Sequence, residues 1–224
     1  MGMSQNITDQ IERRQELERQ NERLEEFASI VSHDLRSPLS VAGGHLELAQ
    51  ETCESDHLVR AADALDRSQA LIDDLMKLAR EGEAVGELEP VDLADVAERS
   101  WQTVETGSAT LETHATRTLR ADRSRLQELV ENLYRNAVEH GGDDVTVSVG
   151  AMDGGFYVSD TGPGIPESDR EEVFEAGYST NEDGTGFGLR IVEQITDAHG
   201  WQITVTESEQ GGARFEVAGV KESE

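Results

Sequence analysis

The first 80 residues of the chain place single apolar residues within a largely charged background. Up to residue 31 the apolar positions are Ile7, Ile11, Leu17, Leu24, Phe27 and Val31. Most of the steps between them approximate a heptad, so the pattern predicts one long helix over residues 1 to about 52. Its first part, 1–26, has too little apolar surface to stand alone and is expected to form a coiled coil with a copy of itself. A solvated single helix is the alternative. Pro38 is expected to kink the helix just downstream, because proline cannot donate to the helix ladder.

A second amphipathic pattern follows a turn that is expected between Thr52 and Asp56. It predicts a helix over about His57–Arg80, whose apolar stripe consists of Leu58, Ala61, Ala62, Leu65, Ala70, Leu71, Leu75 and Leu78. Two amphipathic helices with a short connection form an antiparallel hairpin, which cannot bury both stripes alone. Residues 27–82 are therefore expected to dimerise into a four-helix bundle.

Composition changes at a glycine- and glutamate-rich stretch, residues 83–89, which is expected to be a linker. Beyond it, helical and alternating patterns of apolar residues follow one another. Helices are expected over Val91–Val104, from an Asp122 cap to about His140, and over Phe187–Gly200. Strands are expected within Ala109–Ala121, at 145–149, at 155–159, over Trp201–Glu207 and over Ala213–Val220. The stretch from Asp160 to Thr185 is expected to be loop. Residues 90–221 should thus form an α+β sandwich of two layers, with helices against one mixed sheet.

The charge balance is strongly acidic, with 47 Asp and Glu against 19 Lys and Arg and a net charge of −28. Acidic residues are spread over the whole length, which is typical of proteins solvated by carboxylates at high salt and indicates a halophilic origin. Such a surface argues against binding of nucleic acid or of anionic membranes, because both require basic patches.

Cys53 is the single cysteine of the chain, so no disulfide can form within it and a reducing, cytoplasmic compartment is expected. No apolar run approaches about 18 residues, and no transmembrane segment is predicted. The polar, charged N-terminus is not typical of a signal peptide.

His33 lies on the first predicted helix, on the side away from its apolar face. The apolar positions Phe27, Val31 and Leu35 define that face, and a rotation of about 100° per residue turns His33 toward solvent or a partner. Asp34 follows it directly. Taken alone, this pair is compatible with an ordinary surface histidine.

Two asparagines, Asn132 and Asn136, stand four residues apart at the edge of the apolar arc of a later helix. Amide groups at the rim of a buried face can ligate a hard cation or meet phosphate oxygens. Capping or hydrogen bonding within the core is the alternative.

Two glycine-containing segments flank the predicted loop. Asp160 ends a strand and is followed by Gly162 and Gly164, so its carboxylate can accept from an exocyclic amine such as that of adenine, although a tight turn would use the same residues. The second segment, 184–189, opens a helix and suits phosphate. It lacks the βαβ unit of a dinucleotide fold and the Gly-Lys-Ser/Thr of a P-loop.

In order and spacing these segments resemble the conserved boxes of histidine kinases, over roughly residues 20 to 220. The N, G1, F and G2 boxes correspond to Asn132-x-x-x-Asn136-Ala137, Asp160-x-Gly162-x-Gly164, Val173-Phe174-Glu175 and Gly184-x-Gly186-x-Gly188-Leu189. Ser32-His33-Asp34-Leu35-Arg36-Ser37-Pro38-Leu39 resembles the H box of the commonest class, upstream on a helical hairpin as the family requires.

The resemblance implies a sensor histidine kinase of a two-component system, a homodimer with an ATP-binding domain of the Bergerat type. It implies that His33 accepts the γ-phosphoryl group of ATP, while Asp34 orients the imidazole and takes its proton. The phosphoryl group would then pass to an Asp in the receiver domain of a response regulator.

The resemblance also implies binding sites for ATP and Mg²⁺. Asn136 would bind the Mg²⁺ that bridges the phosphates, with Asn132 nearby, and Asp160 would recognise adenine, on which His140 would stack. The remaining ATP-binding positions, which would line the lid between the boxes, are Gly162, Gly164, Gly184, Thr185, Gly186 and Gly188.

Two positions depart from the family pattern. Glu139-His140 stand where a Lys with Tyr or Phe is frequent, so a phosphate-binding lysine is absent. Ser37 stands where kinases with phosphatase activity prefer Thr or Asn, which leaves dephosphorylation of the partner open.

Two other functions remain open at this point. ATPases of the gyrase and chaperone type share the fold but use a glutamate four residues before the metal-binding asparagine, where this chain has Asn132. A non-catalytic dimeric scaffold is the second alternative, although the intact His33, Asn136 and Asp160 argue against it.

Overall fold

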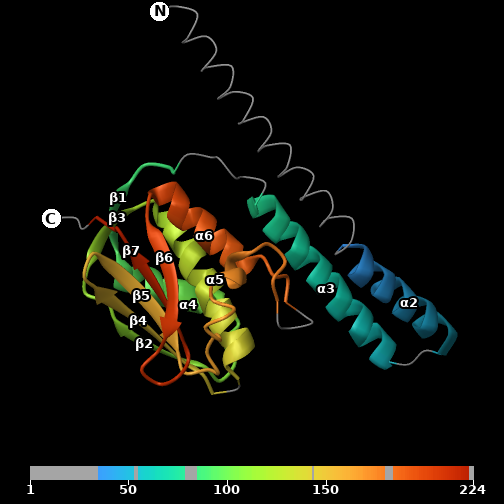
Figure 1. Cartoon of the computed structure of the whole chain (residues 1–224). Helices are drawn as coiled ribbons and strands as arrows, with labels where there is room; N and C mark the ends of the chain where they lie inside the picture. The colour runs from blue at the N-terminus through green and yellow to red at the C-terminus, as the bar shows by residue number, and fades with distance from the viewer. Residues whose placement is uncertain (1–34, 53–54, 79–84, 143, 180–183, 222–224) are drawn as a thin grey trace, which may run out of the picture. The chain divides into compact units, whose positions relative to one another are not determined.

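The computed structural model describes residues 35–52, 55–78, 85–142, 144–179 and 184–221 (Figure 1). The chain divides into two compact units, Met1–Met76 and Lys77–Glu224, each of which is described by itself. The coiled coil predicted for 1–26 and the pair His33 and Asp34 lie outside the described residues.

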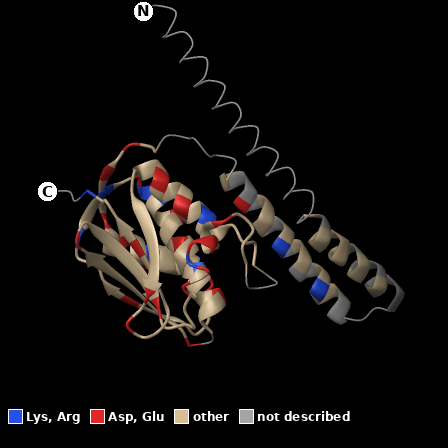
Figure 2. Cartoon of the chain, in the orientation of Figure 1, with Lys and Arg blue, Asp and Glu red and all other residues tan. Residues whose placement is uncertain are grey.

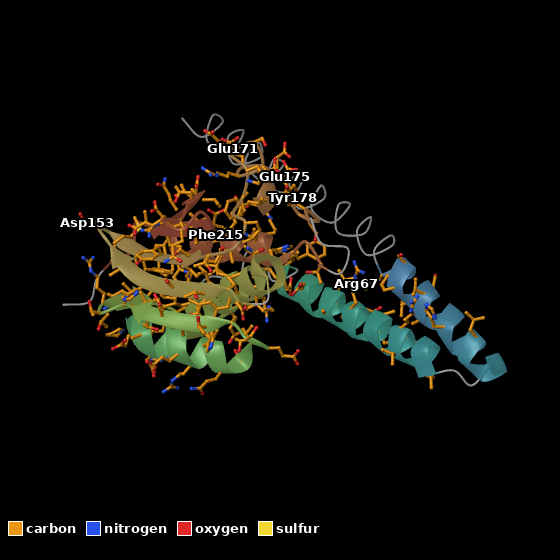
Figure 3. All side chains as sticks on the ribbon, turned by 90° about the horizontal axis from the view of Figure 1, so that it is seen from below. Arg67, Asp153, Glu171, Glu175, Tyr178 and Phe215 are labelled. Atoms are coloured by element: carbon orange, nitrogen blue, oxygen red, sulfur yellow. The ribbon has the colours of Figure 1, made fainter. Side chains whose placement is uncertain are left out.

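The described part of the first unit is a pair of helices, α2 (Arg36–Thr52) and α3 (Ser55–Leu78), which lie side by side in Figures 1 and 3. Helix α2 ends at Thr52, as predicted, whereas α3 begins and ends two residues earlier than the predicted range of about 57–80. Helix α2 continues unbroken through Pro38 and through the adjacent Gly43 and Gly44.

Mostly small side chains and Leu71 are buried on the two helices, and most of the larger apolar side chains are exposed. Ala42, Ala61 and Ala64 are buried, as is Ser68, whose Oγ donates to the carbonyl oxygen of Ala64 at 2.8 Å. Seven large apolar side chains expose between 40% and 57% of their surface: Leu39, Val41, Leu48, Leu58, Val59, Leu65 and Ile72. Much of the apolar surface of these two helices is therefore not covered by the residues that the structure describes.

The second unit has two layers, a five-stranded sheet and three helices that cover one of its faces (Figure 1). The strand order is β2-β4-β5-β7-β6, in which β2 and β4 are parallel and all other neighbours are antiparallel. The elements are β2 (Thr110–His114), β4 (Thr146–Met152), β5 (Gly155–Asp160), β6 (Gln202–Glu207), β7 (Ala213–Ala218), α4 (Leu93–Thr103), α5 (Arg123–Gly141) and α6 (Gly188–His199). This confirms the predicted sandwich of helices against a mixed sheet.

A second, two-stranded sheet was not predicted. It pairs β1 (Glu89–Asp92) with β3 (Thr118–Ala121), and Val91 lies opposite Leu119. The helix predicted to begin at Val91 therefore begins only at Leu93. Asp92 is its N-cap, because the carboxylate accepts from the backbone nitrogens of the next turn.

The core lies between the sheet and the helices. Alternate strand residues point into it, as the predicted strands require. The buried apolar residues include Val147, Val149, Phe156, Val158, Phe215 and Val217 from the sheet and Leu126, Leu129, Val130, Leu133, Ile191, Val192 and Ile195 from α5 and α6. The ring of Tyr134 on α5 meets that of Trp101 on α4 edge to face, with centroids 5.1 Å apart.

Asp122 fixes the start of α5, as predicted. Its Oδ1 accepts from the backbone nitrogens of Ser124 at 3.0 Å and Arg125 at 3.2 Å, and its Oδ2 accepts from the backbone nitrogen of Gly86 at 3.0 Å. The predicted linker is thus attached, through Gly86, to the start of the helix that carries the two candidate asparagines.

His199 ties the end of α6 to the start of α5. Its Nε2 accepts from the backbone nitrogen of Asp122 at 3.2 Å, so its Nδ1 carries the proton and donates to the carbonyl oxygen of Ile195 at 2.8 Å. The imidazole also stacks on Trp201, with ring centroids 4.1 Å apart. Burial lowers the pKa of His199, which favours this neutral form.

The described residues between β5 and α6 are mostly loop, as predicted, with one short 3-10 turn, η1 (Glu172–Phe174). Val173 and Phe174 are buried and anchor the segment to the domain. Tyr178, labelled in Figure 3, donates its hydroxyl to Asp169 at 3.2 Å. No described helix is both long enough and apolar enough to span a membrane.

Candidate active site

Helix α5 carries three candidate residues in one row, because Asn132, Asn136 and His140 are four residues apart. Asn132 is buried, with 3% of its surface exposed, whereas Asn136 and His140 are half-buried. The row runs along the edge of the buried face, as the sequence predicts.

Both ends of the Asn132 amide are bound by protein groups. Its Nδ2 donates to the carbonyl oxygen of Glu128 at 2.8 Å, and its Oδ1 accepts from Nη2 of Arg135 at 3.0 Å. A Cβ added to Gly188, the first residue of α6, would lie 3.5 Å from this Oδ1, so the start of α6 runs close to Asn132. The sequence analysis did not identify Arg135.

The Asn136 amide, in contrast, makes no hydrogen bond to any residue that the structure describes. Its carbonyl oxygen is therefore available to a cation, and oxygen is the ligand type that Mg²⁺ prefers. Within the described ranges no group of three or more His, Cys, Asp and Glu could hold a metal ion. This donor set fits an ion held by one amide oxygen together with phosphates and water.

Asp160 ends β5 with its carboxylate held in place. Its Oδ1 accepts from the backbone nitrogens of Gly162 at 2.8 Å and Ala213 at 3.1 Å, and only 7% of the residue is exposed. Burial raises the pKa of Asp160, while the two amides and the nearby His140 act in the opposite direction. No described residue donates to Oδ2, which remains for a ligand.

The backbone around Asp160 leaves no room for side chains. A Cβ on Gly212 would lie 2.1 Å from the carbonyl oxygen of Asp160, and one on Gly162 would lie 2.7 Å from Cα of Gly141, at the end of α5. Ser208 donates its hydroxyl to the carbonyl oxygen of Asp160 at 2.8 Å and accepts from the nitrogen of Gly212 at 2.9 Å. Glycine at both positions thus allows three segments to meet.

The turn between β6 and β7 belongs to this site, and sequence reasoning missed it. Gly164 has φ +73°, and a Cβ there would lie 2.8 Å from the carbonyl oxygen of Gly211. The signal that could have identified the turn is the adjacent pair Gly211 and Gly212 at the predicted hairpin. Its distance in sequence from Asp160 concealed the contact.

The second glycine segment packs on the loop that precedes it. Gly186 has φ +71°, and a Cβ there would lie 2.7 Å from the carbonyl carbon of Gly177. The Gly186 carbonyl oxygen accepts from the nitrogen of Gly177 at 3.1 Å. Gly184 and Thr185 are half-buried beside it.

The structure thus brings five of the predicted residues together in two groups. One holds Asp160 with Gly162 and, by its electrostatic effect, His140; the other holds Asn132 with Gly188. Figure 2 shows Asp and Glu distributed over the helices and turns of this unit.

Two family models match the chain. One, described as a histidine kinase-, DNA gyrase B- and HSP90-like ATPase, matches residues 121–223, and the other, the His Kinase A (phospho-acceptor) domain, matches residues 23–84. The sensor histidine kinase ZraS of Salmonella typhimurium is 32% identical over 208 residues, which cover 85% of this chain and 44% of that protein. The chain thus spans less than half the length of this relative.

Solved structures give the same result. Full-length ShkA, in complex with AMPPNP, is 28% identical with a TM-score of 0.59, covering 89% of this chain and 46% of that one. Histidine kinase ThkA, in complex with the response regulator protein TrrA, is similar in fold, with 23% identity, a TM-score of 0.71 and coverage of 95% and 66%. The resemblance stated from the sequence is confirmed. The chain belongs to the sensor histidine kinases and carries a phospho-acceptor domain followed by an ATPase domain of the type shared with gyrase B and HSP90.

Proposed function

We propose that this chain is an ATP-dependent protein-histidine kinase that phosphorylates its own His33 and passes the phosphoryl group to an Asp of a response regulator. The observation that carries the proposal is the carboxylate of Asp160, whose Oδ1 is held by two backbone amides while Oδ2 accepts from no described residue. A buried acceptor in a fixed direction matches the exocyclic amine of adenine. ATP is therefore the nucleotide that the site favours.

Mg²⁺ is the proposed metal, and its chemistry is to neutralise charge on the phosphates during transfer. Asn136 would hold it through its amide oxygen. Asn132 would lie near the metal without binding it, because its amide is already bound by Glu128 and Arg135. His140 would stack on adenine beside Asp160.

His33 would be the nucleophile and Asp34 the base that orients its imidazole and takes its proton. Glycines of the two segments and Thr185 would line the lid over ATP, and the stretch around residues 83–89 would act as the hinge on which the domains close. These roles rest on the match of the H box and of the glycine boxes.

An ATPase that forms no phosphohistidine is the second candidate. Asn132 argues against it, because its amide is held by a carbonyl and a guanidinium and offers no carboxylate to activate water. Phosphoryl transfer to His33 is therefore favoured over hydrolysis.

The proposal also covers the oligomeric state of the protein, the conditions under which it works and its partner. The exposed apolar residues of α2 and α3 support a homodimeric four-helix bundle, with 1–26 as a coiled coil. The acidic composition supports function at high salt, as in halophiles, and the single Cys53 supports a reducing cytoplasm. The receiver domain of a response regulator is the expected partner.

The test is incubation with γ-labelled ATP and Mg²⁺ at high salt, followed by treatment with acid and with alkali. We expect a label on the protein that is labile in acid and stable in alkali, and that His33→Ala removes it without changing ATP affinity beyond about twofold. ATP turnover without label would point to the ATPase, and absence of nucleotide binding to the scaffold.

A further inference from the structure

Arg135 on α5 donates to a neutral amide, although acidic residues stand one turn away on both sides. Its neighbours one turn away in both directions, Glu131 and Glu139, are acidic, and such pairs at a spacing of four commonly form ion pairs. Within the described part of the chain Arg135 pairs with no carboxylate, and its Nη2 donates instead to Oδ1 of Asn132 at 3.0 Å. Glu131 accepts from Thr103 and Gln127, at 2.9 and 2.8 Å.

The other arginines of α5 and α6, in contrast, pair with carboxylates. Arg125 pairs with Glu128 at 3.3 Å, and Arg190 pairs with Glu193. Arg123 contacts both Glu89 and Asp95. The chain holds 47 acidic residues against 19 Lys and Arg, yet among the described residues the Arg135 guanidinium is bound to a neutral amide and not to a carboxylate.

Arg135 contacts Asn132, one of the candidate ATP-binding residues. It precedes Asn136 in sequence, and the Asn132 oxygen that it contacts lies near Gly188, where α6 begins. The guanidinium has five N–H donors in a planar fork that matches phosphate oxygens, and Asn132 occupies one of them. The lysine that histidine kinases frequently carry after the N box is replaced here by Glu139, so the site needs another cation.

We propose that Arg135 binds the terminal phosphate of ATP, while its contact with Asn132 directs the guanidinium toward the site. The proposal rests on the proposed function, since it assigns a residue to the same ATP site. It makes Arg135 a specificity residue that distinguishes nucleoside triphosphate from diphosphate.

The test compares Arg135→Gln and Arg135→Lys with Arg125→Gln, a control that removes a paired arginine from the same helix. Affinities for ATP and for ADP are measured by calorimetry with Mg²⁺, together with the yield of phosphohistidine and the unfolding temperature. We expect Arg135→Gln to lose about tenfold or more in ATP affinity while ADP affinity stays within about twofold. Arg135→Lys should recover part of the loss, and Arg125→Gln should bind both nucleotides as the wild type does.

Two results would overturn the assignment. An Arg135→Gln protein that binds ATP as tightly as the wild type has lost no phosphate contact. Equal losses for ATP and ADP would mean that Arg135 only supports Asn132 and the helix. Failure of the proposed function is a different outcome, because the wild type itself would then form no phosphohistidine, either with ATP turnover, as in an ATPase, or without binding either nucleotide, as in a scaffold.

Discussion

Replacing Asp160 by Asn tests the base-recognition role with a minimal change of shape. The amide oxygen of Asn can keep the two hydrogen bonds that Oδ1 accepts from Gly162 and Ala213, at 2.8 and 3.1 Å. Its NH₂ group then stands where Oδ2 was, so a donor faces the amine of adenine. The variant loses one charge-assisted hydrogen bond, which contributes on the order of 1.5–3 kcal/mol, or about tenfold to a hundredfold in affinity.

The structure also predicts that this variant stays folded. Burial raises the pKa of Asp160, so the ionised carboxylate is less favourable in the folded than in the unfolded chain at neutral pH. A neutral amide that keeps both backbone bonds removes that cost. The unfolding temperature of Asp160→Asn should therefore equal or exceed that of the wild type at neutral pH.

The assay is calorimetric titration of ATP and GTP into the wild type, Asp160→Asn and the control Asp153→Asn. Asp153 is exposed in the turn between β4 and β5 and is labelled in Figure 3. We expect Asp160→Asn to lose the preference for ATP over GTP and Asp153→Asn to keep it. An Asp160→Asn protein that is stable and still discriminates against GTP would refute the assignment of the base site.

Four further predictions follow from the structure. Asn136→Ala should slow phosphohistidine formation by orders of magnitude while nucleotide affinity without Mg²⁺ is kept, which labelled ATP and calorimetry can measure. Because burial lowers the pKa of His199 below the value of about 6.5 in an unfolded chain, its contribution to stability is full above about pH 6.5 and is lost as pH falls. His199→Gln should reduce this loss in unfolding curves. Asp122→Ala should cost about 0.5–2 kcal/mol of unfolding free energy in urea, because α5 loses its cap. Sedimentation at high salt should give twice the 24.5 kDa of one chain, and a monomer at tens of micromolar would contradict the hairpin dimer.

The fold could be predicted wherever a local pattern determines the structure. Alternation around Val147 fixes β4, and Asp122 followed by an apolar helical arc fixes the start of α5. Val91 was misassigned because it continues the helical pattern, whereas pairing with Leu119 on β3 places it in a strand. Asp92, a preferred N-cap residue directly before Leu93, was the local signal that could have corrected the boundary.

The candidate site could be predicted only in part, because its residues come from separate segments. The bond between Asp160 and Gly162 is local and follows from a glycine two residues beyond a strand end. The hydrogen bonds from Ala213 and Ser208 to Asp160 depend on β7 lying next to β5 in the sheet, and no short sequence motif indicates that these two strands are neighbours. A strand order that is fixed by the whole fold thus supplies two of the groups that hold the carboxylate and backbone of Asp160.

The sequence could not predict which of Asn132 and Asn136 binds the metal. In the sequence they are equivalent, since both are amides at the rim of one helical face, and either could ligate a cation. The structure separates them, because Glu128 and Arg135 bind both ends of the Asn132 amide and no described group binds that of Asn136. A cation that took the Asn132 oxygen would have to displace a guanidinium or lie beside its charge, which Coulomb repulsion disfavours. The metal is therefore expected at Asn136, and Asn132 holds the arginine.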